Sequence, residues 1–398
     1  MAEHTIQELK TRQALPLEIK IRMTEQRIRE WVNVFGIDGV YVSFSGGKDS
    51  TVLLHIARRI YPDMKAVFVD TGLEYPEIRQ FVKTFDNVDW IKPKMNFKQV
   101  IEKYGYPFIS KEVSECVQGA RKYLHSLIAD GTIITDRQTD RQTDRQTDSI
   151  SILINTTNYS ALVDMLKRKM INREGGANER LLIMLGALPP KTHKTEIIPD
   201  KSLYSQEKYK FFLESPFEIS NKCCNVMKKA PAHDYGKRTG RKPILATMAE
   251  ESRLRTQKWL QNGCNGFEMK SPVSTPMAFW TNQDILKYIK GNGIEICKVY
   301  GDIVPDYEAQ DQLQGQMDIS ELGLAEDTRK LKTTGCDRTG CMFCGFGCHL
   351  NNDDRFTRMK ETHPKQYDYI MRPKEQGGLN YKEVIDWINE HGNLNIRY

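Results

Sequence analysis

The chain has 398 residues, of which 58 are basic and 52 acidic, and its formal net charge is +6. So mild a charge balance does not by itself indicate a nucleic-acid-binding protein, and no apolar run is long enough to cross a membrane. Met1 to Lys10 is polar and lacks the apolar core of a signal peptide. We therefore expect a cytoplasmic protein whose nine cysteines serve metal binding or redox chemistry, not disulfides.

Strands and helices alternate along the first part of the chain. A helix is expected over residues 16–35, where apolar side chains form a rough stripe. Strand–helix pairs are then predicted at 39–43 and 49–60, at 66–70 and 76–85, and at 88–91 and 97–104. This alternation predicts an α/β fold, a doubly wound, mostly parallel sheet with helices on both faces. Ligands of such sheets bind at the carboxyl ends of the strands.

The turn after the first predicted strand has the composition of a phosphate-binding loop. It reads Ser43-Phe44-Ser45-Gly46-Gly47-Lys48-Asp49-Ser50 and leads directly into a helix. Its glycines let the backbone pass close to a ligand, and its N–H groups and the helix N-terminus form an anion site. Lys48 adds a positive charge, and Ser45 and Ser50 add hydroxyl donors. We expect this loop to bind a phosphate chain.

A second polar segment, Asp70-Thr71-Gly72, follows the second predicted strand, and Pro76 opens the helix after it. In a parallel sheet the carboxyl ends of both strands lie at the ligand-binding edge. We therefore expect Asp70–Gly72 and Ser45–Ser50 at the same edge.

An insertion interrupts the pattern at residues 121–215. Within it, Asp136–Thr147 repeats the tetrapeptide Asp-Arg-Gln-Thr three times without an apolar residue. Such a tract cannot join a core, so we expect it to be disordered. Residues 151–170 are expected to form a helical arm.

The α/β pattern resumes with a predicted strand at Pro243–Met248, followed by an acidic turn that ends at Arg255. An arginine here suits a bidentate contact to phosphate or sulfate. The alternative is that Ser252 caps a helix and Arg255 lies on the surface. A further helix, expected to be structural, begins within residues 276–285.

The cysteines fall into two groups. Cys223 and Cys224 are adjacent, and four more lie near the end of the chain, at Cys336, Cys341, Cys344 and Cys348. The Cys341-x-x-Cys344 spacing lets two thiolates meet one metal ion or one edge of a cluster. The three isolated cysteines are expected to be buried apolar residues: Cys116, Cys264 and Cys297.

Basic residues gather between Lys222 and Lys242, where Asp234 is the only acid. This stretch is either a solvated surface loop or a nucleic-acid contact.

The motifs resemble those of a known family. Ser45–Ser50 resembles the PP-loop, SGGKDS, of the adenine-nucleotide α-hydrolase superfamily, and Val67–Glu77 resembles a segment of the phosphoadenosine phosphosulfate (PAPS) reductase family. The resemblance implies binding of ATP or PAPS, with Mg²⁺ beside ATP, and catalytic roles for Lys48, Asp49 and Arg255. The nucleotide-binding residues that it implies are Ser43, Ser45, Gly46, Gly47, Lys48, Asp49, Ser50, Asp70, Thr71, Gly72 and Ser252.

Three interpretations of the cysteines remain open. Resemblance to cluster-bearing sulfonucleotide reductases implies a [4Fe–4S] cluster held by Cys223, Cys224, Cys341 and Cys344, and we favour it. The second uses the ferredoxin-like spacing C-x4-C-x2-C of the terminal group, with Cys348 as a poor fourth ligand. The third is a structural zinc site.

Two departures from the reductases bear on the reaction. Reductases that form sulfite carry a nucleophilic cysteine in a short C-terminal motif, and no cysteine follows Cys348 here. Reductases usually have a degraded PP-loop, whereas Lys48 and Asp49 match the form that uses ATP. Both departures favour ATP-dependent adenylation coupled to sulfur transfer. The alternatives are reduction of an adenylyl sulfate to sulfite, and a non-catalytic nucleotide- or nucleic-acid-binding module.

The partners are expected to be an adenine nucleotide and a sulfur donor or thiol reductant, with a nucleic acid as one candidate acceptor. The expected organisation is an N-terminal helix at 1–35, an α/β domain at 36–120 and 216–330 split by the insertion at 121–215, and a cysteine-rich helical segment at 331–398.

Overall fold

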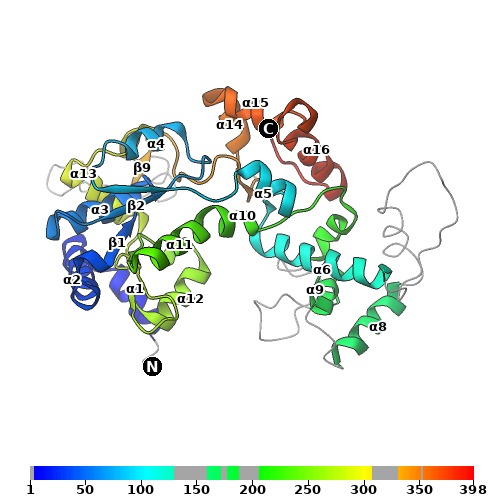
Figure 1. Ribbon diagram of the computed structural model, residues 1–398, viewed down its shortest axis with the longest axis horizontal. Coiled ribbons are helices and arrows are strands. Elements are labelled where there is room, and N and C mark those ends of the chain that lie inside the picture. Colours follow the sequence, from blue (N-terminus) through cyan, green and yellow to red (C-terminus); the bar gives the residue numbers. More distant parts are fainter. Residues whose placement is uncertain (1–3, 130–158, 172–176, 188–205, 307–329, 351–352) are drawn as a thin grey trace, which may run out of the picture. The chain divides into compact units, whose positions relative to one another are not determined.

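The structure is a computed structural model that describes residues 4–129, 159–171, 177–187, 206–306, 330–350 and 353–398 (Figure 1). The chain forms two compact units. Unit 1 comprises Met1–Lys94 and Met227–Met342, and unit 2 comprises Met95–Val226 and Phe343–Tyr398. The Asp-Arg-Gln-Thr repeat lies outside the described residues.

Unit 1 is built on a six-stranded sheet with the order β3-β2-β1-β5-β7-β6. All neighbouring pairs are parallel except β6 with β7, so the predicted mostly parallel α/β sheet is confirmed. The register places Val42 of β1 beside Ala66 of β2 and Ile244 of β5. The strands are β1 Val40–Ser43, β2 Ala66–Val69, β3 Val88–Ile91, β5 Lys242–Ile244, β6 Asn265–Gly266 and β7 Val273–Ser274; β8 Ile303–Pro305 and β9 Leu331–Thr333 form a separate antiparallel pair.

Helices pack on this sheet through a continuous apolar core. Helix α3 contacts β1, and both α2 and α13 pack on α3 (Figure 1). Trp31, Trp280 and Tyr288 are fully buried between these elements. Strand β1 reads as an unbroken apolar run because both of its faces are covered. The helices of unit 1 are α1 Ile6–Gln13, α2 Leu17–Phe35, α3 Lys48–Ile60, α4 Pro76–Val82, α11 Ala230–Thr239, α12 Arg253–Asn262 and α13 Asn282–Asn292, with single turns η1 Ile37–Gly39, η4 Ala249–Glu251 and η5 Lys298–Tyr300.

A buried ion pair ties α2 to α13. Lys20 Nζ lies 2.7 Å from Asp284 Oδ2 and also donates to the carbonyl of Gln13 at 2.6 Å. The same carboxylate oxygen accepts the N–H of Thr281, the N-cap residue of α13, at 2.7 Å. Removing one partner of such a pair leaves the other charge buried and uncompensated.

The substitution Asp284→Ala is therefore expected to lower the free energy of unfolding by about 3–5 kcal/mol. Chemical denaturation followed by circular dichroism measures it. The control is Arg29→Met, which removes a half-exposed i,i+4 pair with Glu25 on α2 and should change the free energy of unfolding by less than about 1 kcal/mol. Equal effects of the two substitutions would contradict the stabilising role of the buried pair.

Unit 2 is mainly helical in the residues that the structure describes. Its helices are α5 Phe97–Tyr104, α6 Lys111–Ala129, α8 Tyr159–Ile171, α9 Ala177–Met184, α10 Lys222–Cys224, α14 Arg355–Thr362, α15 Pro364–Met371 and α16 Tyr381–Gly392, with η2 Glu207–Glu214 and η8 Lys374–Gln376. The π-helical turn η3, Asn225–Lys229, runs across the division between the units. A short parallel pair, β4 Phe108–Ile109 with β10 Gly345–Phe346, joins the two chain segments of unit 2.

Arg121 of α6 fixes the returning chain of unit 2. Its Nη1 donates to the carbonyl oxygens of Ser215 and Phe217, both at 2.9 Å, and of Phe212 at 3.2 Å. Burial lowers the pKa of this guanidinium, and Glu218 opposes the shift. The buried arginine therefore serves packing in unit 2.

The division into units differs from the one expected from sequence. The helix expected at 97–104 is present as α5, but it packs on α10 in unit 2 and does not belong to the sheet domain. The N-terminal residues belong to unit 1 with the sheet. The terminal cysteine segment is split at Met342, so that Cys336 and Cys341 fall in unit 1 and Cys344 and Cys348 in unit 2.

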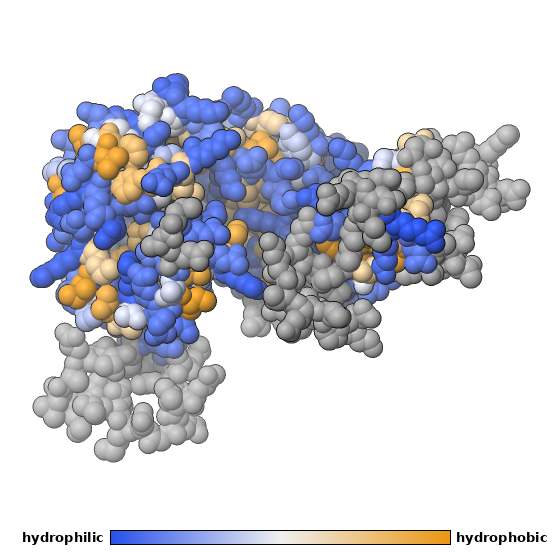
Figure 2. Space-filling model, turned by 90° about the horizontal axis from the view of Figure 1, so that it is seen from below, coloured by the Kyte–Doolittle hydropathy of each residue, from blue (hydrophilic) through white to orange (hydrophobic). Residues whose placement is uncertain are grey.

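The surface carries mostly hydrophilic side chains, with apolar residues scattered among them on the face shown in Figure 2. None of the helices in the described ranges has both the length and the apolarity that a membrane span requires.

Candidate nucleotide site and cysteine centre

The predicted phosphate loop lies between β1 and α3. Strand β1 ends at Ser43 and α3 begins at Lys48. Gly46 has a φ of +70°. A Cβ added there would lie 2.7 Å from the Val82 side chain and 2.9 Å from that of Ile78, both on α4. Both the left-handed backbone and the close approach of α4 therefore require glycine at this position.

Serine hydroxyls hold the loop in shape. Ser50 Oγ donates to the carbonyl of Gly47 at 2.9 Å and accepts the N–H of Ser45 at 3.2 Å. The two serine oxygens are 3.0 Å apart, and Ser45 Oγ accepts the N–H of Gly47 at 3.3 Å. These hydrogen bonds within the loop fix its conformation, which reduces the ordering cost of ligand binding.

Lys48 supplies a buried positive charge at the start of α3. Its side chain is 4% exposed. Its Nζ lies 3.4 Å from Asp49 Oδ1 and donates to the carbonyl of Asp337 at 3.2 Å. Its backbone N–H donates to the Tyr300 hydroxyl at 3.1 Å, which anchors the start of the helix. A cation at a helix N-terminus is suited to bind an anion.

A cavity of about 400 Å³ opens at this loop. Seven of the residues predicted from sequence line it: Ser43, Ser45, Gly47, Lys48, Asp49, Ser50 and Arg255. The remaining lining residues come from the segment after β5, from η4, from η5 and from residues 338–340, and they are Leu245, Ala246, Thr247, Glu251, Tyr300, Arg338, Thr339 and Gly340. We call this space the nucleotide cavity.

Two arginines share one carboxylate in the nucleotide cavity. Arg255 is paired with Glu251, and Arg338 Nη2 lies 3.4 Å from the other oxygen of Glu251. Burial lowers the pKa of Arg255, the neighbouring Arg338 lowers it further, and Asp49 opposes the shift. Lys48 and the two arginines outnumber the carboxylates of Asp49 and Glu251, so the cavity has an excess of positive charge that suits an anionic ligand.

Five predicted nucleotide-binding positions do not line the cavity: Gly46, Asp70, Thr71, Gly72 and Ser252. Ser252 caps α12 by accepting the N–H of Arg255 at 3.4 Å. This is the alternative that sequence left open for Ser252. Arg255 itself reaches the cavity and is not an ordinary surface residue.

The Asp70–Gly72 segment forms a closed turn at the carboxyl end of β2. Asp70 Oδ2 accepts from Arg79 Nη2 at 2.8 Å, and Asp70 Oδ1 accepts the N–H of Gly72 at 3.3 Å. Thr71 Oγ1 donates to Glu74 at 2.7 Å. These side chains therefore have partners within the protein, although they lie at the expected edge of the sheet.

Sequence reasoning missed Tyr300 and the Arg338-Thr339-Gly340 segment. The Tyr300 hydroxyl lies 2.6 Å from Thr339 Oγ1, and burial raises the pKa of Tyr300 to about 12. Arg338 lies between Cys336 and Cys341, a stretch interpreted only through its cysteine spacing. A basic residue before Thr-Gly was the available signal for a second anion contact. Tyr300 had none, because only the fold brings it to the loop.

Arg338 is expected to contribute directly to nucleotide affinity. Arg338→Ala should weaken ATP binding about tenfold or more, because a charge-assisted contact to phosphate is lost. Calorimetric titration with ATP and Mg²⁺ measures this. Arg241→Ala is the control, because Arg241 donates to the carbonyl of Val40 and lies outside the cavity. A dissociation constant unchanged in Arg338→Ala would remove this residue from the site.

The cysteines predicted to bind a cluster are divided between the units. Cys223 and Cys224 lie on α10 and Cys344 just before β10, all in unit 2. Cys341 is near the end of the segment of unit 1, three residues before Cys344. Within the described part of the chain, no three His, Cys, Asp or Glu side chains are placed so as to hold a metal ion.

The surroundings of Cys344 and Cys348 disfavour loss of their thiol protons. Burial raises the pKa of Cys344, and that of Cys348 to about 12. Arg355 Nη1 donates to the carbonyl of Cys344 at 2.6 Å and is itself held by Asp353. Metal ligation would require loss of these protons, so it would depend on pH. Cys336, in unit 1, lies 3.9 Å from the Tyr75 hydroxyl.

A serine- and glycine-rich turn between a parallel strand and a helix, with basic side chains around one cavity, defines a phosphate-binding α/β protein. Residues 39–152 and 184–345 match the phosphoadenosine phosphosulfate reductase domain. The chain belongs to this family, whose members are enzymes of the PP-loop type.

Two further similarities are more limited. The uncharacterized protein MJ0973 of Methanocaldococcus jannaschii is 40% identical over 73 residues, which is 17% of this chain and 18% of that protein. A solved structure of PAPS reductase from Candida auris, a phosphate complex, is 12% identical, with a TM-score of 0.32 over 76% of this chain and 96% of that one.

Proposed function

We propose that the protein binds ATP in the nucleotide cavity and transfers its adenylyl group to an oxygen of an acceptor, after which a sulfur donor attacks the acceptor and AMP leaves. The observation that carries the proposal is the buried Lys48 beside Asp49 at the start of α3, in one cavity with Arg255 and Arg338. A PP-loop with this lysine suits a terminal chain of β- and γ-phosphates, which ATP provides. Family membership supports the class of nucleotide enzyme.

The loop residues would bind the β- and γ-phosphates. The N-terminus of α3 and the Lys48 ammonium offer donors and positive charge to these phosphates. Arg255 and Arg338 would exchange part of their interaction with Glu251 for the α-phosphate. The acceptor oxygen attacks the α-phosphorus, and the bond to the bridging oxygen breaks, so that pyrophosphate leaves. Charge stabilisation by pre-positioned cations is the main contribution of such a site.

Asp49 is the residue suited to hold Mg²⁺. Its Oδ1 is buried and lies 3.4 Å from Lys48 Nζ, yet it accepts no hydrogen bond among the described residues. A carboxylate oxygen is the type of ligand that Mg²⁺ prefers. The ion would neutralise negative charge on the phosphates, while Lys48 and the arginines orient them.

We further propose that Cys223, Cys224, Cys341 and Cys344 hold a [4Fe–4S] cluster, with zinc as the alternative. Four thiolates are the donor set that selects such centres. The side chains as placed do not converge on one ion, so the proposal rests on donor chemistry, on the C-x-x-C spacing and on the family resemblance. A bound cluster would supply soft iron sites for sulfur ligands.

The second candidate is reduction of PAPS or adenylyl sulfate to sulfite, which the name of the family favours. One experiment separates the two reactions. Anaerobic protein is incubated either with ATP, Mg²⁺ and an RNA or small-molecule fraction of a cell extract, or with PAPS and dithiothreitol. Pyrophosphate release that depends on one extract fraction is the expected result. Sulfite release from PAPS, without pyrophosphate release from ATP, would contradict the proposal.

A further inference from the structure

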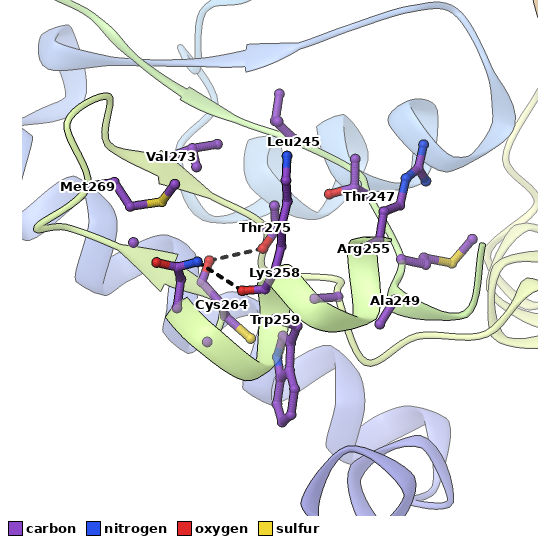
Figure 3. A pocket seen from close by; sticks show the side chains of 15 residues that line it. Leu245, Thr247, Ala249, Arg255, Lys258, Trp259, Cys264, Met269, Val273 and Thr275 are labelled. Atoms are coloured by element: carbon purple, nitrogen blue, oxygen red, sulfur yellow. Dashed lines mark hydrogen bonds between the residues drawn. The ribbon is translucent and has the colours of Figure 1, made fainter. Parts of the chain in front are cut away.

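A second, smaller pocket lies beside the nucleotide cavity. It has a volume of about 180 Å³ and lies between α12, the segment after β5, and strands β6 and β7. Lys258 and Trp259 line it from α12, and Figure 3 shows Lys258 extending towards Leu245, with Met269 and Val273 on the strand side. We call it the side pocket. Leu245, Thr247 and Arg255 line both spaces, so the two share a wall.

The lining of the side pocket is mainly apolar. Met248, Trp259, Cys264 and Ala278 are all buried. Burial raises the pKa of the Cys264 thiol, so this side chain is neutral and acts as a small apolar group. Methionine and cysteine sulfur atoms are polarizable and accommodate ligands of different shape.

Two of the polar side chains around the pocket bond within the protein, whereas Trp259 Nε1 is buried with no hydrogen-bond partner among the described residues. Thr275 Oγ1 donates to the carbonyl of Cys264 at 3.2 Å, and Asn262 Nδ2 donates to the carbonyl of Lys258 at 3.0 Å (dashed lines in Figure 3). A nucleobase placed here would bury ring nitrogens and an exocyclic group with few partners, which costs free energy. A hydrocarbon group has no such cost. The mainly apolar lining therefore favours an apolar group, and the adenine of the nucleotide is the competing occupant.

The volume limits the size of that group. An apolar cavity of about 150 Å³ is known to bind benzene, so the side pocket has room for one six-membered ring or a branched aliphatic group of similar size. We propose that the side pocket receives an apolar group of this size on the acceptor that is adenylated in the nucleotide cavity. Because Arg255 and Thr247 form the shared wall, the polar end of such an acceptor would face the phosphates. This inference rests on the proposed adenylation.

The test uses benzyl alcohol as the probe and the full-length protein. Saturation-transfer NMR measures benzyl alcohol binding, and calorimetry measures ATP binding. Two substitutions fill the pocket: Ala278→Leu in its buried wall and Val273→Phe at a half-buried position of β7. The control is Leu254→Phe, because Leu254 lies on α12 but is 63% exposed and outside the pocket. Thermal melting checks that each variant is folded.

The expected result is saturable binding of benzyl alcohol to the wild type and to Leu254→Phe, and at least tenfold weaker binding to the filled variants. The dissociation constant of ATP should change less than twofold in all of them. Benzyl alcohol binding that is absent, or unaffected by filling, would overturn the inference. A tenfold loss of ATP affinity in the filled variants would also overturn it, because the nucleoside would then occupy the pocket. The wild type could also bind benzyl alcohol, lose this binding when the pocket is filled, and yet not bind ATP. That result would support the side pocket as a binding site and contradict the proposed adenylation.

Discussion

Replacing Lys48 by alanine is expected to weaken ATP binding by about 1–3 kcal/mol, because a charged hydrogen bond to phosphate is lost. The rate of pyrophosphate release should fall further, by about 10²- to 10³-fold, since a donor to developing charge contributes most in the transition state. Lys48 is buried beside Asp49, so the ammonium is already fixed when the nucleotide arrives. Calorimetric titration and a pyrophosphate assay measure the two effects.

Two variants separate charge from packing. Lys48→Met keeps most of the side-chain volume and should lose ATP affinity as Lys48→Ala does. Lys65→Ala removes another lysine of unit 1, one that pairs with Asp89 outside the cavity, and should bind ATP as the wild type does. Wild-type affinity in Lys48→Met would show that the ammonium group does not contact the nucleotide.

Serine at Cys224, Cys341 or Cys344 is expected to remove the bound iron. Anaerobically purified wild type should be brown and contain about four irons per chain, as a [4Fe–4S] cluster requires. Each substitution removes one thiolate ligand. Serine is close to cysteine in size, so the rest of the fold should be little affected. Iron analysis and visible absorbance of the purified variants give the result.

Other cysteines provide the controls and decide between ligand sets. Cys116→Ser and Cys264→Ser should keep the iron, because both residues are buried among apolar side chains. If Cys336→Ser and Cys348→Ser lose the iron while the Cys223 and Cys224 variants keep it, the terminal group alone holds the metal. Stoichiometric zinc without iron would reject the cluster.

Local sequence patterns predicted β1, β2, β3 and β5 of the sheet of unit 1, although β5 ends at Ile244 and not at Met248, and they missed β6 and β7. The strand at 88–91 has the expected bounds, and the first two helices of the α/β pattern differ from expectation by three residues or fewer at either end. Apolar runs, glycines and a proline at the first helical position are local signals for these strands and helices. Tertiary packing favours the same elements, so the local prediction holds. The N-terminal segment at 1–35, expected to hold one helix, contains two, because α1, which lacks a strong apolar stripe, precedes the helix expected at 16–35.

The residues of the site that were not predicted from sequence reach it through contacts between distant parts of the chain. Lys48 meets Tyr300 and Asp337 across separations of 252 and 289 residues. Nothing in the neighbourhood of those residues indicates that they approach the loop. The side pocket was equally hidden, because it requires α12 and β7, a strand of only two residues, to line the same space. Ser252 is the opposite case. The family resemblance implied a nucleotide contact, but a local signal, its role as the N-cap of α12, accounts for its position.

The choice of nucleotide tests the central claim most directly. Anaerobic wild-type protein is melted in the presence of ATP with Mg²⁺ and, separately, of PAPS at the same concentration. A ligand that binds the folded state stabilises it by about 2.7 kcal/mol at 100 times its dissociation constant. We predict a higher melting temperature with ATP, and loss of that shift in Lys48→Met. A shift with PAPS alone, unaffected by Lys48→Met, would contradict ATP-dependent adenylation at this loop.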